Sequence, residues 1–336
     1  MPNRPSTTEF SALLRSDEFR DLGLGRELEL TPAGADRLAL GLRWARERNR
    51  KVRVSRARFD NVGAPDITSC LIRAEAEAKL VDVEAALDAA QLTLGPLSPN
   101  ARKLTVAQWL CGPRSGLRAV PGGRLETAAL TLEVVLWGGE VYRSHASPRA
   151  AAGPDLDYAI LGGGDAVGLL TSALLRAFSR PTTDDRVSVT LPDPARAADV
   201  LHDVLGHEAR PASAELSLVD GMPVLTATFS DLAFRAHRDA ARLREAAALH
   251  GAMPRDAVPK SDDPTLTHEF EVSWEALPGL LELVFPHRVG VHRIARESVI
   301  IASSIALSGD GVVPLDNPVT QPAWLQALAR EMGGAP

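Results

Sequence analysis

The stretch that decides the expected fold of this chain runs from residue 149 to residue 171 and reads Arg149-Ala-Ala-Ala-Gly-Pro-Asp-Leu-Asp-Tyr-Ala-Ile-Leu-Gly-Gly-Gly-Asp-Ala-Val-Gly-Leu-Leu-Thr171. Gly153-Pro154 is typical of a turn, and Asp155 is a good N-cap for a short helix that ends at Leu161. The three glycines at 162–164 end that helix, and residues 167–175 are predicted to return as an apolar strand. Because glycines have no Cβ atom, such a junction lets a ligand or another stretch of backbone come close.

The residues before this stretch predict a mixture of helices and strands. The expected elements are helices that start near Thr31-Pro32 and cover 84–92 and 105–111, and strands at 51–55, 67–73 and 79–83. Residues 127–136 alternate between apolar and mostly polar positions, which is the pattern of a half-buried strand. Trp137-Gly-Gly-Glu140 is a hairpin turn into a strand at 141–143. This order favours an α+β fold over the regular alternation of a doubly wound sheet.

The polar stretch Ser179–Asp185 is the predicted domain boundary. Beyond it the expected elements are strand 187–191, helix 195–205, strands 214–219 and 223–229, helix 232–250 and strand 267–272, with a proline-rich loop at 251–264. This β-α-β-β-α-β order is that of a ferredoxin-like unit. A helix at 275–284, strands at 289–294 and 298–307, and a helix from Pro322 complete the expectation.

Composition limits the class of protein. The chain has 336 residues, of which 45% are hydrophobic and 24% charged, and its net charge of −6 disfavours a polyanion binder. Its two cysteines give neither a disulfide framework nor a metal spacing. No run of about 18 apolar residues predicts a transmembrane segment, and charged residues interrupt the N-terminus where a signal peptide would need an apolar run. We therefore expect a cytoplasmic protein with no transmembrane segment.

With these elements placed, residues 28–176 resemble the FAD-binding domain of the vanillyl-alcohol oxidase / p-cresol methylhydroxylase (PCMH) superfamily, most of all the glycolate oxidase FAD-binding subunit and alkyldihydroxyacetonephosphate synthase. The matching stretches are Leu94–Pro99, Leu104–Leu110, Leu132–Val141 and Arg149–Thr171. The resemblance implies an α+β fold: a two-subdomain PCMH-type FAD-binding domain followed by a reduced ferredoxin-like α+β cap domain. The implied boundaries are 1–25 for an N-terminal helical segment, 26–180 for the FAD-binding domain, 186–320 for the cap or substrate domain and 321–336 for a C-terminal helix.

The resemblance also implies a set of cofactor-binding residues. They belong to a helix start, a turn and the glycine-rich stretch: Thr105, Val106, Ala107, Ser115, Gly116, Gly162, Gly163, Gly164, Gly168, Leu169 and Thr171. FAD would be bound non-covalently, because His145 is the only histidine in this half of the chain. Backbone N–H groups of glycine-rich turns suit the pyrophosphate of FAD, and an apolar slot suits its ring.

Several positions depart from the family pattern. The phosphate-loop position, Val54–Gly63, holds a single glycine, and Ala107-Gln108 stands where the family has two glycines. Basic residues cluster around this position: Arg43, Arg46, Arg48, Arg50, Lys51, Arg53, Arg56 and Arg58. They are either pyrophosphate ligands in place of backbone amides or a solvated helix face with an edge strand. Nucleic acid is not expected as a partner, since few aromatic residues that could stack on bases accompany the run.

No catalytic or metal motif stands out. His202 and His207 are five residues apart on a predicted helix, and His287 and His292 are five apart on a predicted strand, so neither pair shares a face. We expect no metal site, and the catalytic residues stay unassigned. The candidates for substrate contact in the second domain are His268, Arg288, His292 and Arg293.

Two functions remain open from the sequence. The first is an FAD-binding oxidoreductase, the short flavin subunit of a glycolate or 2-hydroxy-acid dehydrogenase-type complex, with a second flavin subunit or an iron–sulfur protein as partner. The alternative is a non-catalytic, degenerate relative that acts as a structural or regulatory partner without bound FAD. The glycines missing from the phosphate-loop position support the alternative.

Overall fold

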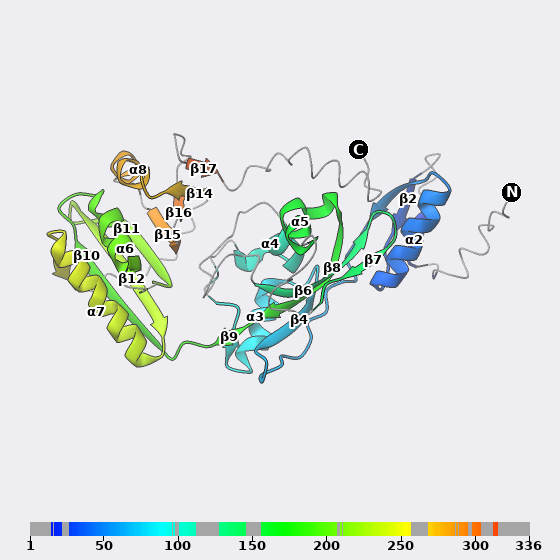
Figure 1. Cartoon of the computed structure of the whole chain (residues 1–336), viewed down its shortest axis with the longest axis horizontal. Coiled ribbons are helices and arrows are strands. Elements are labelled where there is room, and N and C mark those ends of the chain that lie inside the picture. The colour runs from blue at the N-terminus through cyan, green and yellow to red at the C-terminus, as the bar shows by residue number, and fades with distance from the viewer. Residues whose placement is uncertain are drawn as a thin grey trace.

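The structure of the chain is a computed structural model. It describes residues 15, 17–21, 27–95, 97, 101–111, 128–145, 156–206, 209, 211–256, 268–285, 287, 289–294, 298–303 and 312–314. Figure 1 shows these residues as two neighbouring subdomains, which hold the β1–β3 and β4–β9 elements, and a C-terminal lobe that begins at β10. Within the described part of the chain, no helix is long and apolar enough to cross a bilayer.

The first subdomain is a three-stranded sheet with one helix. Its elements are β1 (Phe19–Asp21), β2 (Glu27–Leu30), α2 (Ala35–Glu47) and β3 (Lys51–Val54). β2 and β3 are parallel and joined by α2, and β1 is antiparallel to β2. The buried side of α2 carries Leu38 and Leu42 four residues apart, so that both lie on one face. Burial of one such leucine is worth about 1.5–3 kcal/mol.

The second subdomain is built on the glycine-rich stretch. Its elements are β4 (Leu71–Glu75), α3 (Leu80–Asp88), β5 (Leu92–Thr93), η1 (Ala101–Lys103), α4 (Val106–Cys111), β6 (Ala129–Leu136), β7 (Val141–Arg143), α5 (Leu156–Gly163), η3 (Gly164–Ala166), β8 (Gly168–Arg176) and β9 (Phe178–Ser179). The sheet order is β4-β8-β6-β7, all antiparallel, and β5 pairs with β9. The hairpin and the strand after the glycines form as predicted, whereas the short helix forms but runs past its predicted end at Leu161 to Gly163.

Two predictions in this subdomain are wrong. Residues 79–83 are not a strand, because Leu80, Val83 and Leu87 recur at helical spacing and form the buried side of α3. Residues 67–70 are not part of a strand either. The Asp66 carboxylate accepts hydrogen bonds from the N–H groups of residues 68 and 69, which closes a turn before β4 begins.

In the residues that the structure describes, the C-terminal lobe consists of an eight-stranded sheet and three helices. Its elements are β10 (Thr183–Thr190), α6 (Arg196–Gly206), β11 (Ser213–Val219), β12 (Met222–Asp231), α7 (Ala233–Leu249), β13 (Met253–Arg255), β14 (His268–Ser273), α8 (Leu277–Val284), β15 (Val289–Ile294), β16 (Ser298–Ser303) and β17 (Val312–Pro314). The strand order is β13-β10-β12-β11-β15-β16-β14-β17. Strands β10–β13 form a ferredoxin-like unit in the order β13-β10-β12-β11, and three of its four strands are the predicted ones.

The fourth strand of that unit is not the predicted one. β13 lies in the proline-rich segment that the sequence predicts as a loop, and it pairs with β10. The strand predicted at 267–272 is β14, which pairs with β16 and β17 in the other half of the same sheet. The expected α+β fold is confirmed. In the expected N-terminal helical segment at 1–25, the structure describes residues 15 and 17–21, and the prediction is wrong for Phe19–Asp21, which pair with β2 as the strand β1. The helix from Pro322 lies outside the described residues.

Candidate functional site

Most of the described residues among the predicted cofactor-binding set lie where α4 begins beside the β4–α3 connection and β8. We call this region the cofactor trough. The Ala107 N–H donates to the Ala76 carbonyl at 2.8 Å, and the Val106 N–H donates to the Ala78 carbonyl at 2.9 Å. The Ala76 N–H in turn donates to the Thr171 carbonyl at 2.9 Å. These bonds bring together the helix start and the strand that the sequence predicts to flank a flavin.

The start of α4 is capped by its own side chains. Gln108 Oε1 accepts a hydrogen bond from the Thr105 N–H at 3.0 Å, and Thr105 Oγ1 accepts one from the Gln108 N–H at 3.3 Å. This reciprocal pair is a capping box. Together with the bonds of Val106 and Ala107, it gives each N–H group from 105 to 108 a partner inside the protein. These donors, which would serve an anionic ligand at a helix start, are therefore occupied.

The glycines of the central stretch are required by neighbouring backbone. Gly164 has φ +55°, and a Cβ atom there would lie 2.8 Å from the Cys111 carbonyl oxygen at the end of α4. A Cβ atom on Gly168 would lie 2.7 Å from the Val135 carbonyl oxygen in β6. The space that these two glycines leave is filled by the protein itself. Gly162 and Gly163 form the last turn of α5.

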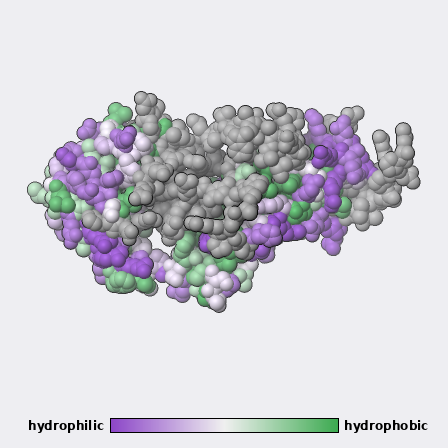
Figure 2. Space-filling view, viewed as in Figure 1, coloured by the Kyte–Doolittle hydropathy of each residue, from purple (hydrophilic) through white to green (hydrophobic). Residues whose placement is uncertain are grey.

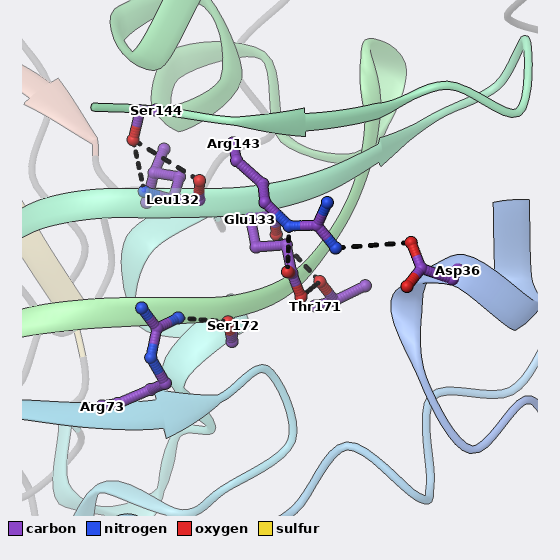
Figure 3. A network of polar contacts seen from close by, with 8 residues as sticks. All are labelled: Asp36, Arg73, Leu132, Glu133, Arg143, Ser144, Thr171 and Ser172. Atoms are coloured by element: carbon purple, nitrogen blue, oxygen red, sulfur yellow. Dashed lines mark hydrogen bonds and ion pairs between the residues drawn. The ribbon is translucent and has the colours of Figure 1, made fainter. Parts of the chain in front are cut away.

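The β8 residues predicted to lie beside a flavin are buried within the protein. Leu169 packs in an apolar cluster with α2. The Thr171 hydroxyl lies 2.9 Å from Glu133 Oε1 and 3.0 Å from the Glu133 carbonyl oxygen, so it donates to this pair of acceptors (Figure 3). The Thr171 hydroxyl therefore makes its hydrogen bonds to Glu133 in β6.

The Glu133 carboxylate continues this network toward the first subdomain. Figure 3 shows the Arg143 side chain between Glu133 and Asp36. Arg143 Nε donates to Glu133 Oε2 at 2.8 Å, and Nη2 donates to Asp36 Oδ1 on α2 at 3.3 Å. The bond to Glu133, its charge and the more distant Asp36 raise the pKa of Arg143. The network therefore joins β8, β6, β7 and α2.

A second group of charged side chains forms ion pairs at the predicted phosphate-loop position. Arg56, two residues after β3, pairs through Nη1 with Asp165 Oδ1 at 2.8 Å and through Nε with Glu77 Oε1 at 3.0 Å. Trp137 Nε1 donates to the Asp165 carbonyl at 2.7 Å and holds that turn. The Arg56 side chain is 19% exposed. The sequence singles out Arg56 but gives no sign of Asp165 or Glu77 as its partners.

Other basic residues of the predicted cluster serve local structure. Arg48 stacks over the Trp44 ring at 4.5 Å, Arg53 lies 3.6 Å from Glu27, and Arg58 pairs with Asp17 at 2.7 Å. Figure 2 shows hydrophilic residues over α2 on the face in view. These contacts agree with the solvated-face interpretation of the cluster.

The remaining sequence candidates do not form a described site. Ser115, Gly116 and Arg288 lie outside the described residues. His268 belongs to β14, whereas His292 and Arg293 belong to β15, and β16 runs between these strands. Within the described residues, no group of three His, Cys, Asp or Glu side chains is arranged to hold a metal.

One hollow of about 280 Å³ lies in the C-terminal lobe. It is bordered by α6, the end of α7 and the turn before α8, and its polar or aromatic residues are Asp199, His202, Asp203, His250, Trp274 and Glu275. His250 Nε2 lies 2.6 Å from Asp203 Oδ2, and the His202 ring meets the Trp274 ring edge-on at 5.2 Å. These two contacts hold α6 against the end of α7 and the turn before α8.

The described residues do not fit FAD. The pyrophosphate of a dinucleotide needs free backbone donors or unpaired cations. At this trough the α4 donors are bonded within the protein, Gly164 and Gly168 abut backbone, and Arg56 is paired with two carboxylates. The geometry of the trough therefore supports no reaction step through a flavin.

No protein-family model matches the sequence, but solved structures share its fold. Alkyldihydroxyacetonephosphate synthase is similar over 97% of this chain and 78% of its own, at 14% identity and a TM-score of 0.68. The 4-ethylphenol oxidase from Gulosibacter chungangensis, in an isoeugenol complex, covers 97% of this chain and 85% of its own, at 12% identity and a TM-score of 0.62. A p-cresol methylhydroxylase with substrate bound gives the same coverage, 97% and 85%, with 12% identity and a TM-score of 0.61. The chain therefore shares the α+β fold of these solved structures over 97% of its length.

Proposed function

We propose that this chain is a non-catalytic subunit built on the fold of FAD-dependent oxidoreductases, a structural or regulatory partner rather than a carrier of flavin. The observation that carries the proposal is the pairing of Arg56 with Asp165 and Glu77 across the predicted cofactor trough. The capping of α4 by Gln108 supports it independently.

Electrostatics favours the closed trough over a bound dinucleotide. A pyrophosphate carries negative charge, and in this trough it would meet two carboxylates with one guanidinium between them. Two like unit charges 4 Å apart at a protein surface repel by about 4 kcal/mol at an effective dielectric constant of 20. Arg56 alone does not offset both carboxylates and the pyrophosphate. The anion would therefore have to displace Asp165 and Glu77 from Arg56.

The test is flavin content. We expect purified full-length protein to show no flavin absorption between 350 and 500 nm, and an FAD titration followed by flavin fluorescence to show no saturable binding at micromolar protein. Stoichiometric flavin in the purified protein, or saturable FAD uptake, contradicts the proposal.

A second candidate is the FAD-binding short subunit of a glycolate or 2-hydroxy-acid dehydrogenase-type complex. It is favoured by the retention of the fold over 97% of the chain, the C-terminal lobe included, in the comparison with p-cresol methylhydroxylase. Its expected partners are a larger flavin subunit or an iron–sulfur protein. This candidate predicts that the protein, supplied with FAD and such a partner, reduces a dye acceptor with glycolate or lactate. The first proposal predicts that any activity of that mixture belongs to the partner.

A further inference from the structure

The two N-terminal subdomains meet at a small apolar seam. The buried residues of this cluster come mostly from β2 and α2, and β6 and β8 contribute Val135 and Leu169. The turn after β6 lies directly on α2, since a Cβ atom on Gly139 would be 2.8 Å from the Ala39 carbonyl oxygen. Leucines make up five of its nine buried residues, so apolar packing carries much of the contact between the subdomains. Polar contacts at its margins add to this packing.

The loop that follows β3 crosses from the first subdomain to the second and is held there at two points. Phe59 is 3% exposed and belongs to the apolar core of the second subdomain. Its carbonyl accepts the Glu77 N–H at 2.7 Å. Arg56 supplies the other point through its ion pairs with Glu77 and Asp165.

Arg56 differs from the other bridging arginine in what surrounds it. The Arg56 side chain is 19% exposed and its partners Glu77 and Asp165 are 28% and 52% exposed, whereas Arg143 is 56% exposed and its partners Glu133 and Asp36 are 23% and 83% exposed. Exposed ion pairs contribute about 0.2–1 kcal/mol and are screened by salt, whereas sheltered ones keep more of their energy. In addition, removal of Arg56 would leave Asp165 and Glu77 as uncompensated neighbouring charges.

We infer that the ion pairs of Arg56 with Glu77 and Asp165 fix the first subdomain against the second, at the place where the resemblance puts a dinucleotide. We call these two ion pairs the lock. The inference rests on the proposed function in one respect, namely that no dinucleotide shares the trough with Arg56. The chain then folds and holds its subdomains together without a cofactor.

The alkylation rate of the Cys111 thiol can report whether the Arg56 ion pairs are intact. Its carbonyl abuts Gly164, next to Asp165. Burial, followed by the Asp165 charge, raises the pKa of the Cys111 thiol to about 12, and the Arg56 charge acts in the opposite direction. Loss of the Arg56 charge by itself would therefore slow alkylation of Cys111. Faster alkylation in an Arg56 variant can only report that the trough has opened.

The experiment uses full-length wild-type protein, Arg56→Met, Asp165→Asn, the double variant and the control Arg143→Met. We expect Arg56→Met to lower Tm by roughly 2–4 °C, the shift of about 1 kcal/mol in a domain of this size. We expect its Cys111 to react with iodoacetamide at least about tenfold faster, because thiol reactivity follows access as well as pKa. Asp165→Asn should add little in the Arg56→Met background, since their shared contact is already lost. Arg143→Met should leave Cys111 protected.

Additive effects of the two substitutions, or unchanged Cys111 labelling in Arg56→Met, overturn the inference. Should Arg56→Met fail to fold, Arg56→Lys keeps the charge with one donor group, and an intermediate labelling rate is expected. A parallel FAD titration separates the two proposals: FAD binding by the wild type ends the proposed function, whereas the labelling and Tm cycle judges the lock.

Discussion

Gly168 at the start of β8 faces the Val135 carbonyl oxygen so closely that a Cβ atom there would lie 2.7 Å from it. Substitution of this glycine therefore tests packing of β8 on β6 and says nothing specific about a ligand. We expect Gly168→Val to destabilise the protein by about 1–3 kcal/mol, the usual cost of overpacking a core. Urea unfolding followed by circular dichroism measures it. Gly206→Ala is the matched control, because nothing lies within 4 Å of a Cβ atom there. Equal midpoints for the two variants would contradict the packing argument.

The capping box of α4 predicts a separate loss of stability. Thr105→Val keeps the shape of the side chain but removes the oxygen that accepts the Gln108 N–H. Loss of such a cap costs about 0.5–2 kcal/mol. The unfolding midpoint in urea should fall accordingly, and Thr105→Ser, which retains the hydroxyl, should restore it. A valine variant as stable as wild type would show that the cap contributes nothing measurable to the free energy of unfolding.

Glu84 predicts a pH dependence of stability. Burial raises the pKa of its carboxyl group, although the Leu94 N–H at 2.6 Å and the Thr93 hydroxyl counteract this. The folded state therefore holds the proton more tightly than the unfolded state. The stabilisation from this carboxyl is complete below the unfolded pKa of about 4.3 and is lost as pH rises through the raised folded pKa.

Glu84→Gln removes this dependence. We expect the variant to have a higher Tm than wild type at pH 7, and the difference to shrink as pH falls toward about 4. Thermal melts across this range measure the effect, with the exposed Glu275→Gln as control. A Tm difference that is constant with pH would show that the substitution acts through packing alone.

The two cysteines should differ in reactivity. With its pKa raised to about 12 by burial, Cys111 is almost entirely a thiol at pH 8, with about one thiolate in ten thousand. Both side chains are partly exposed, so it is the small thiolate fraction of Cys111 that slows its reaction, and we expect iodoacetamide at pH 8 to modify Cys70 first. Peptide mass spectrometry distinguishes the two sites. Equal labelling of both in the native protein would contradict the raised pKa of Cys111.

Local sequence signals predict the elements that depend on neighbours along the chain. The hairpin at Trp137–Glu140 forms because its two glycines suit a tight turn, and α4 starts where Thr105 offers a capping oxygen. The wrong prediction at 79–83 concerns a short apolar run that fits either period, and the helical spacing of Leu80, Val83 and Leu87 decides it. β13 escapes prediction because a strand of three residues with a proline carries little strand signal.

The candidate site is less predictable because its contacts are long-range. Arg56 and Asp165 are 109 positions apart, and nothing in either local sequence indicates that they pair. The glycines at 164 and 168 signal a close approach, but the sequence does not say whether a ligand or the protein's own backbone makes it. In this structure Cys111 and Val135 make it. The place where FAD would lie follows from the resemblance, whereas the contacts that fill this place follow only from the structure.

The position of β13 at the margin of the eight-stranded sheet has a consequence for how the protein behaves at high concentration. Pro254 sits in the middle of this outermost strand and has no N–H group to offer to a neighbouring chain. Met253 beside it is 70% exposed, so this edge strand also presents an apolar side chain to solvent. Because Pro254 lacks an N–H group, a second molecule cannot form the full row of backbone hydrogen bonds that adding a strand at this edge requires. The proline therefore disfavours edge-to-edge aggregation of this lobe.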